Sequence, residues 1–244
     1  MKIIFEERKA MLKYEHIAKE INDSISNNEF AVGDKLPSVE MLKAKYQVSK
    51  STIIKALEIL EKEGTIYQTR GSGIYVRNKK KSGYINLLKT KGFSDNLHEH
   101  QITSKVLTLQ LIRPDNNVKE HLRLKDKNTH VYYVERIRYL DDHPLCIETS
   151  YFNTDLVNHL DNQIAASSIF EYLQSQLKIN IGFSDIYFYI DFLSEREAPK
   201  LSLHPNDPCM RHELTFYTTT GIPFDYSNIV YHYKYANFFI PIES

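Results

Sequence analysis

The sequence has few cysteines, little glycine and proline, no tryptophan and no long apolar run. Eight glycines and eight prolines among 244 residues argue against a collagen-like or disordered chain. No run of 18 apolar residues occurs, so we expect no segment that spans a bilayer. The two cysteines, Cys146 and Cys209, are too few for a disulfide framework and share no metal-binding spacing with histidine. We expect them to be ordinary buried thiols.

The start of the chain and the absent enzyme signatures narrow the function further. Residues 6–9 are charged where a secretory signal peptide has its apolar core, so we expect a cytoplasmic protein, with Met11 as an alternative start. The signatures GxSxG, GxxxxGK and HExxH do not occur. The pattern at residues 98–100, His-Glu-His, has no third ligand nearby, and a surface loop explains it better than a metal site. No metal and no other cofactor is predicted.

Charge is balanced over the chain as a whole but not along it. Residues 1–81 carry 16 basic and 11 acidic side chains, whereas residues 82–244 carry 15 and 20. The first part therefore has a net charge of +5 and the second of −5. This asymmetry suggests a basic module that faces a polyanion and an acidic module with another task. A chance bias in surface charge explains the same counts equally well.

Apolar spacing predicts three helices at the start of the chain. The first spans residues 13–27, Ser38 caps a short second helix, and Ser49 caps a third that ends at Glu63. Gly64 follows in the position where a left-handed cap is needed. Three helices therefore follow one another within about fifty residues.

A hairpin and a domain boundary follow the third helix. The β-prone runs at residues 66–69 and 74–76 flank a glycine turn. Three helices and a hairpin are the order of a winged helix-turn-helix, which we place at residues 11–77. Residues 78–83 are polar and basic, as is typical of a linker. The second domain then covers residues 84–244.

In the second domain strands and helices intermingle without a repeat, which predicts an α+β fold with an antiparallel sheet. A hairpin is expected from residues 131–140 and 145–152. Strands at 214–219 and 229–235 are expected to form a second antiparallel pair around a turn at residues 220–223. The other expected elements are strands at 106–112 and 186–193, a helix capped by Ser168, and a short helix at 195–203.

The third helix is basic at its start and acidic at its end. Its apolar face leaves Lys50, Ser51, Thr52 and Lys55 pointing outward in the first turns. Free backbone N–H groups at the helix start add to the attraction for phosphates. For this helix alone a routine solvated surface is the better explanation. With the short helix before it and the glycine hairpin after it, DNA binding is favoured.

These segments resemble the DNA-binding domain of the gluconate-repressor (GntR) superfamily. The motifs that carry the resemblance are Leu36-Pro37-Ser38, Val48 to Ile53, Ala56 to Gly64 and Gly71 to Val76. The resemblance implies operator contacts at the second and third helices and a wing tip that reaches the minor groove, which together assign Ser38, Lys50, Ser51, Thr52, Arg70, Gly71, Ser72 and Gly73. The family usually has arginine at the positions of Glu40 and Lys50. Because a glutamate cannot read guanine, Glu40 either accepts from a cytosine or makes no DNA contact.

In the second domain, Arg136 and Arg138 lie two residues apart on a predicted strand and therefore share one face. If the turn consists of residues 141–143, Arg136 lies directly opposite Glu148. Two guanidiniums on one face can bind an anion. A solvated cross-strand ion pair, worth about 0.2 to 1 kcal/mol, is the plainer explanation and is favoured by spacing alone.

A family resemblance favours the anion-binding site over the solvated ion pair. Motifs along the domain resemble the effector-binding (UTRA) domain of the HutC subgroup. These motifs are Gly92-Phe93-Ser94, Val134 to Arg138, Ile147 to Tyr151, Ser167 to Phe170 and Phe224 to Ser227. Similar members bind small molecules, often sugar phosphates, and the residues that match their pocket are Ser94, Arg136, Arg138, Glu148, Ser168, Asp225 and Tyr231. Serine hydroxyls at apparent helix starts and arginines suit a phosphate, carboxylates suit sugar hydroxyls, and a tyrosine suits a ring. Asp225 replaces the commoner glutamate.

Together these observations predict a one-component transcription regulator, with a repressor as the expectation. It would bind a palindromic operator in double-stranded DNA as a homodimer, away from any membrane, and respond to a small effector such as a phosphorylated sugar. The resemblance implies a chorismate-lyase-like fold for the second domain, so an enzyme is one alternative. A DNA-binding dimer that ignores effectors is the other.

Overall fold

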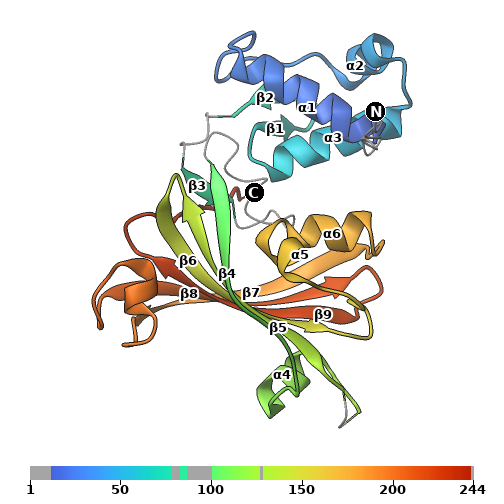
Figure 1. Ribbon diagram of the computed structural model, residues 1–244. Helices are drawn as coiled ribbons and strands as arrows, with labels where there is room; N and C mark the ends of the chain where they lie inside the picture. The colour runs from blue at the N-terminus through green and yellow to red at the C-terminus, as the bar shows by residue number, and fades with distance from the viewer. Residues whose placement is uncertain (1–11, 78–82, 87–100, 127–128, 243–244) are drawn as a thin grey trace, which may run out of the picture. The chain divides into compact units, whose positions relative to one another are not determined.

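The computed structural model describes residues 12–77, 83–86, 101–126 and 129–242, and the chain divides into two compact units (Figure 1). The first unit comprises residues 1–81 together with 239–244, and the second comprises residues 82–238.

The last residues are grouped with the first unit, although the sequence placed them in the second domain. Gly64 lies so close to them that a Cβ atom there would come within 2.9 Å of Pro241 and 3.2 Å of Phe239. Gly64 also has a φ of +70°. A residue without a Cβ is therefore needed twice over, for the left-handed helix end and for this close approach.

Three helices and a hairpin form the first unit, as the sequence predicted. Its elements are α1 (Lys13–Ser26), α2 (Val39–Tyr46), α3 (Lys50–Lys62), β1 (Ile66–Thr69) and β2 (Gly73–Val76). The helix starts have local causes, because Ser38 Oγ accepts a hydrogen bond from the Met41 N–H and Ser49 Oγ accepts one from the Thr52 N–H. One core joins helices and hairpin, with Ile53, Ala56, Leu57 and Leu60 of α3 and Ile66 of β1 all almost fully buried.

A six-stranded antiparallel sheet dominates the second unit. Its strands are β4 (Ile102–Ile112), β5 (Val131–Leu140), β6 (His143–Asn153), β7 (Ile181–Phe192), β8 (Pro208–Thr218) and β9 (Pro223–His232). They lie in the order β4-β5-β6-β9-β8-β7, so β4 and β7 form the two edges. The remaining elements are β3 (Tyr84–Asn86), which pairs with β10 (Asn237–Phe239), and the short helices α4 (Asn116–His121), α5 (Asn162–Ala166), α6 (Ile169–Ser175) and η2 (Ala198–Leu201).

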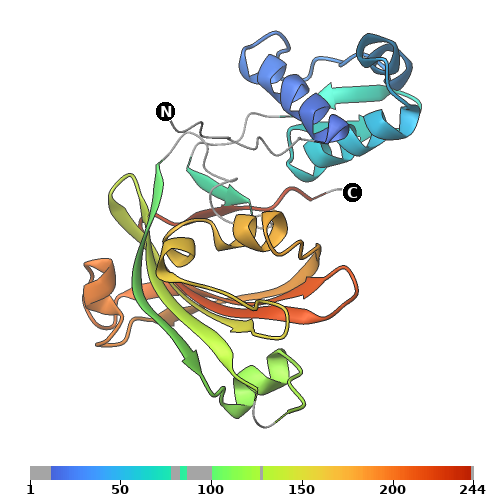
Figure 2. The same ribbon diagram turned by 45° about the vertical axis from the view of Figure 1, so that its right-hand side comes forward.

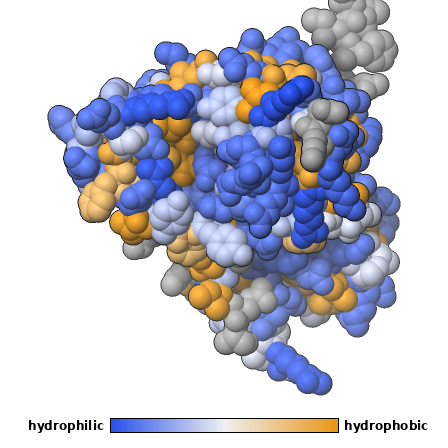
Figure 3. Space-filling model, turned by 90° about the horizontal axis from the view of Figure 1, so that it is seen from below, coloured by the Kyte–Doolittle hydropathy of each residue, from blue (hydrophilic) through white to orange (hydrophobic). Residues whose placement is uncertain are grey.

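The two faces of this sheet carry different covers. Helices α5 and α6 lie over one face (Figures 1 and 2), where Ile169 and Leu173 pack against Val134 and Phe152. On the opposite face, η2 packs against Ile147 and Val230, and α4 packs beside Val131 and Tyr226. From below, apolar residues show as separate small groups among polar ones (Figure 3).

In the hairpin of β5 and β6 the predicted strand register is correct although the predicted length of the turn is wrong. Arg136 does lie opposite Glu148, as predicted. The turn, however, has two residues, Asp141 and Asp142, both with positive φ, rather than three. Positive φ at both central residues is the conformation of a type I′ hairpin turn, and aspartate tolerates it better than most residues. An irregularity in pairing between Arg138 and Tyr139 shifts the strands by one residue and restores the predicted register.

Element bounds differ elsewhere from the sequence prediction. Strand β9 ends at His232 and not at 235, β7 begins five residues earlier than expected, and the helix predicted at 195–203 is a single 3-10 turn at η2. Strands β3 and β10 and helices α4 and α5 were not predicted. Each has six residues or fewer, too few to produce a clear apolar period.

Candidate functional sites

The first turn of α3 presents polar side chains to solvent. Lys50 and Ser51 are exposed, and Thr52 is partly buried. Ser49 Oγ, besides capping the helix, lies 2.9 Å from Ser51 Oγ and 2.8 Å from Thr52 Oγ1. The three hydroxyls therefore form one small network at the helix start. Ser38 is also exposed and caps α2.

Glu40 lies between two lysines on the same surface. Its carboxylate is 3.4 Å from Lys43 Nζ and 3.9 Å from Lys50 Nζ. All three side chains are largely exposed, so the pairs are weak. The arrangement gives Glu40 a local role that needs no base contact, and it lowers the positive potential around Lys50.

The turn between β1 and β2 is exposed and built around two glycines. Arg70, Gly71 and Ser72 all face solvent, and Gly71 and Gly73 have φ values of +76° and +139°. Residues with a Cβ rarely adopt the second of these φ values, so the backbone conformation requires glycine at position 73. Ser72 Oγ lies 2.6 Å from the hydroxyl of Tyr75, which steadies the turn.

In the second unit, a polar cluster is buried on the sheet face that α5 and α6 cover. Arg136 is 2% exposed, and its guanidinium donates to Glu148 Oε2 at 2.9 Å, to the Ala165 carbonyl at 2.8 Å and to the Ser167 carbonyl at 3.3 Å. Arg138 approaches the same Glu148 oxygen at 3.7 Å. The pair is therefore buried, which corrects the expectation from spacing alone that it lies on a solvated sheet.

Neighbouring charges decide the protonation of this cluster. Burial opposes ionisation of Glu148, but Arg136 and Arg138 outweigh it and hold the pKa of its carboxyl below the ordinary value. Asp225 is 1% exposed and has no arginine or lysine in contact among the residues that the structure describes, so burial raises its pKa to about 8 despite a hydrogen bond from Ser227. At neutral pH Glu148 is ionised and Asp225 holds a proton, so only Asp225 can donate from its carboxyl.

The structure brings most of the predicted effector residues to one face. Ser168 caps α6 next to the Ser167 carbonyl that Arg136 contacts. Tyr231 on β9 lies opposite Cys146 on β6, and Cys146 lies opposite Arg138 on β5, so all three side chains share one face of the sheet. Ser94 and the pattern at residues 98–100 lie outside the described residues.

Sequence reasoning missed three polar residues on this face. Ser227 Oγ lies 2.8 Å from both Ser150 Oγ and Asp225 Oδ1, and His212 is 1% exposed. Ser150 and Ser227 stand inside motifs already noted, at even spacing from Glu148 and Asp225, so alternation along the strands was an available signal.

The chemistry of this cluster suits binding rather than turnover. Its guanidiniums and hydroxyls can hold an anionic, hydroxyl-bearing molecule. Burial raises the pKa of the Cys146 thiol, which keeps this potential nucleophile protonated. Among the described residues no group of three or more histidine, cysteine or acidic side chains could hold a metal ion. No helix in this described part is long and apolar enough to cross a membrane.

Comparison with known proteins identifies both units. Residues 13–76 match the bacterial regulatory proteins of the gntR family, and residues 98–236 match the UTRA domain. The chain is 43% identical over 234 residues to the uncharacterized HTH-type transcriptional regulator YydK of Bacillus subtilis. This alignment covers 96% of this chain and 99% of YydK. The crystal structure of YydK matches with a TM-score of 0.82 at 42% identity, over 96% of this chain and 100% of that one.

More distant relatives are regulators as well. The HTH-type transcriptional regulator GmuR of B. subtilis is 27% identical over 220 residues, covering 89% of this chain and 92% of GmuR. The mannosyl-D-glycerate transport/metabolism system repressor MngR of Escherichia coli is 24% identical over 216 residues, covering 88% of this chain and 89% of MngR.

Proposed function

We propose that this chain, which belongs to the GntR family of bacterial regulatory proteins and carries a UTRA domain, is a cytoplasmic repressor that a phosphorylated sugar releases from its operator. Family membership makes it a DNA-binding transcriptional regulator with an effector domain, and its relatives are regulators rather than enzymes. The alternative of a chorismate-lyase-like enzyme is therefore dropped. Repression and the class of effector are the new steps.

The convergence of two guanidiniums on one oxygen of Glu148 carries the effector proposal. Both arginines are buried, and Arg136 Nε has no hydrogen-bond partner among the described residues. A buried donor without a hydrogen-bond partner destabilises the protein by about 1 to 3 kcal/mol. A ligand that supplies an acceptor would remove this cost, which adds to its affinity. Phosphate oxygens match the fork of an arginine. A sugar needs groups that bind its hydroxyls. These are supplied by Ser168, Asp225, Ser150 and Ser227.

A sugar is also favoured by one relative, since the printed name of MngR describes a repressor for a mannosyl-D-glycerate system. Release then requires that the effector bind one arrangement of the DNA-binding units more tightly than another. A hundredfold loss of operator affinity needs a difference of about 2.7 kcal/mol between the two arrangements.

Thermal unfolding with a panel of sugar phosphates tests the effector class. An effector at about 100 times its dissociation constant should stabilise the fold by about 2.7 kcal/mol. The Arg136→Met variant should lose this shift, whereas Arg196→Met, which removes an arginine with a 72% exposed side chain, should keep it. If no sugar phosphate shifts the wild type, the effector-independent alternative is supported instead.

On the DNA side, the proposal assigns operator contacts to the exposed start of α3, to Ser38 and to the turn of Arg70 to Gly73. Helix starts of this kind enter the major groove, and a basic turn suits the phosphates beside it. A gel shift with the DNA upstream of the chain's own gene tests this, and unchanged mobility at modest salt would refute it.

We further propose that the chain forms a homodimer and that the edge strand β7 is the surface through which two copies associate. This edge strand carries six large apolar side chains that are between 49% and 67% exposed: Phe183, Tyr187, Phe188, Tyr189, Ile190 and Phe192. Because side chains alternate along a strand, Phe183, Tyr187 and Tyr189 lie on one face of the sheet and Phe188, Ile190 and Phe192 on the other, so a strand paired along this edge contacts some of each set. An unpaired apolar edge of 12 residues is an aggregation hazard unless another strand covers it. We assign a second copy of β7 as the occupant, because a palindromic operator would be bound by a dimer with twofold symmetry.

Light scattering coupled to size exclusion tests this surface. Tyr187→Asp combined with Ile190→Asp should convert the dimer to a monomer and weaken operator binding. Leu111→Asp changes an exposed side chain on β4, the other edge of the sheet, and should leave the dimer intact. A dimer that survives the double substitution would show that β7 is not the interface.

A further inference from the structure

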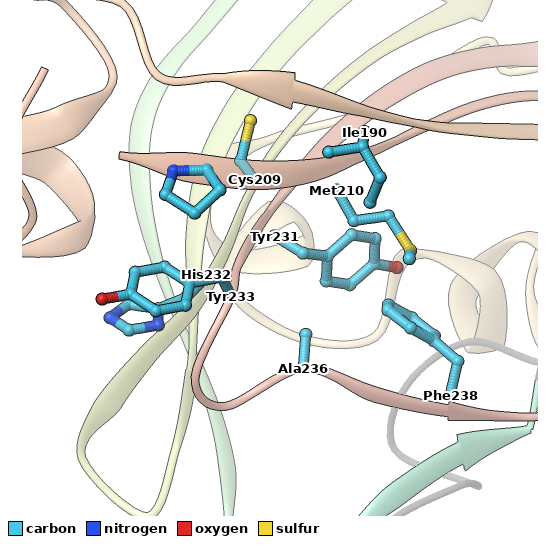
Figure 4. A pocket seen from close by; sticks show the side chains of 9 residues that line it. Ile190, Cys209, Met210, Tyr231, His232, Tyr233, Ala236 and Phe238 are labelled. Carbon is cyan, nitrogen blue, oxygen red and sulfur yellow. The ribbon is translucent and has the colours of Figure 1, made fainter. Parts of the chain in front are cut away.

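Exposed apolar side chains occur in both units, and those of the second unit lie mostly on β7. There Ile190 also borders a hollow of about 130 Å³, whose other walls include Met210, Tyr231 and Phe238 (Figure 4). The proposed dimer would bury this edge of the sheet and so accounts for the apolar side chains on it. Ile54 is not part of that surface, because it lies on α3 in the first unit, where its side chain is 40% exposed.

The packing of the first unit does not explain an isoleucine at position 54. The core of this unit takes Ile53, Ala56, Leu57 and Leu60 from α3. Ile54 belongs neither to that core nor to the partly buried apolar side chains around it. Isoleucine also has a lower helix propensity than alanine, lysine or arginine, because its branched side chain loses rotamer freedom in a helix. Any of those three residues would serve the fold at least as well at this position.

A single exposed apolar side chain is common on a protein surface, so the position of Ile54 carries more information than its exposure. Residues three and four apart are neighbours on a helix surface, so Ile54 lies beside Ser51 and Lys50. Both neighbours are exposed and belong to the helix start that the proposed function assigns to operator DNA. An apolar group therefore lies within the surface assigned to DNA, about one turn along α3.

The two lysines on either side of Ile54 are drawn in different directions. A rotation of about 100° per residue places Ile54 between Lys50 and Lys55 around the helix. Lys50 Nζ lies 3.9 Å from Glu40 Oε1 on α2, and Lys55 Nζ lies 5.7 Å from the centre of the Tyr14 ring on α1. An apolar group thus stands between two cations at this level of the helix.

The major groove of DNA offers one apolar group to such a side chain, the C5 methyl of thymine. The other base edges there are hydrogen-bond donors and acceptors, for which isoleucine has no partner. Lysines on both sides suit the phosphates that border the groove. Because a β-branched side chain has one strongly preferred rotamer in a helix, Ile54 loses little conformational freedom when it makes a contact. A thymine methyl is therefore the partner that fits an exposed isoleucine at this position.

We propose that Ile54 recognises a thymine in each half of the operator through contact between its side chain and the C5 methyl group. This inference rests on the proposed function, because it assumes that the start of α3 enters the major groove. It adds a specific base to the DNA contacts already assigned to Lys50 and Ser51. Operator affinity then depends on a methyl group that carries no charge and makes no hydrogen bond.

Replacement of thymine by deoxyuridine tests this contact, because uracil differs from thymine only by the missing C5 methyl group. The probe is the shortest labelled fragment from upstream of the chain's own gene that the wild-type protein binds, with each thymine replaced in turn. Fluorescence anisotropy should show at least one position where the replacement weakens wild-type binding about fourfold, which corresponds to one buried methyl group.

Two variants assign this effect to the side chain. Ile54→Ala removes the contact and keeps the helix, since alanine has the higher helix propensity, and it should bind the thymine and uracil forms of the fragment equally well. Val32→Ala shortens another exposed aliphatic side chain, in a turn outside α3, and is the matched control that should keep the difference. A change in DNA shape caused by uracil would weaken the binding of both variants alike.

The outcomes distinguish this contact from the function on which it rests. If the wild type binds the fragment but no replacement weakens its binding, the thymine contact is refuted, while the assignment of α3 to DNA stands. The same holds if Ile54→Ala loses as much affinity on replacement as the wild type does. If the wild type binds no upstream fragment at modest salt, the proposed function fails on its DNA side and this inference fails with it.

Discussion

Replacing Arg136 with methionine removes the most heavily hydrogen-bonded donor of the buried cluster. Among the described residues Glu148 then keeps Arg138, at 3.7 Å, as its cationic partner, together with its hydrogen bond to Ser150, and the carbonyls of Ala165 and Ser167 lose the guanidinium donor. Breaking a buried ion pair from one side costs about 3 to 5 kcal/mol, because the other charge stays buried. We therefore expect the free energy of unfolding of the second unit to fall by about this amount.

A second substitution separates the lost pairing from lost packing. Arg136→Met combined with Glu148→Gln removes the uncompensated charge and keeps an acceptor for Arg138. The double variant should therefore be more stable than Arg136→Met alone by at least about 1 kcal/mol. Arg196→Met is the control, since its partner Glu135 lies 3.3 Å away but the arginine is exposed, and it should cost less than about 1 kcal/mol.

Urea unfolding followed by hydrogen exchange in β5 and β6 measures these differences and keeps the two units apart. A loss below about 1 kcal/mol for Arg136→Met would mean that the pair behaves as a solvated cross-strand contact. The account of a buried, ligand-ready cluster would then be wrong.

Three further predictions concern protonation and DNA. Because burial raises the pKa of Asp225 to about 8, the folded state holds a proton that the unfolded state releases, and this contribution to stability is lost as pH rises from about 4 to 8. In urea titrations Asp225→Asn should gain on the wild type by about 1.4 kcal/mol per pH unit between about pH 5 and 7.5, and a constant difference would contradict this. In fluorescence anisotropy, Lys50→Ala should reduce the slope of log affinity against log salt by about 0.9 per copy. Lys62→Ala, at the other end of α3, should not, and equal losses would refute the assignment of the helix start. Glu40→Gln should tighten DNA binding by releasing Lys43 and Lys50, whereas weaker binding would indicate that Glu40 contacts a base.

Local signals in the sequence were sufficient to predict the three helices and the hairpin of the first unit, but not that residues 239–244 are grouped with it. Ser38 and Ser49 cap their helices through hydrogen bonds that involve only the next three residues, and Gly64 ends α3 with the expected positive φ. Such features depend on neighbours in the chain, so they can be identified without knowing the fold.

Properties set by depth and by distant strands could not be predicted in the same way. The pairing of Arg136 with Glu148 was predicted from an assumed three-residue turn, which a two-residue turn and one irregularity in pairing happen to match. Its burial depends on α5, which lies some 30 residues further along the chain. The proton on Asp225 follows from its position in the middle of a covered sheet, and the burial of His212 from rings on β9 and β10. A sequence pattern shows which face a side chain shares but not what covers that face.

On the proposed function, the chain binds operator DNA through α3, and a phosphorylated sugar at Arg136 and Arg138 releases it from that DNA. Titration with sugar phosphates, followed by the anisotropy of a labelled fragment from upstream of the chain's own gene, measures this release. The wild-type complex should dissociate as an effective compound is added, whereas the Arg136→Met complex should form but not respond. A wild-type complex unaffected by every phosphorylated sugar, or an Arg136→Met complex that dissociates like the wild type, would contradict it.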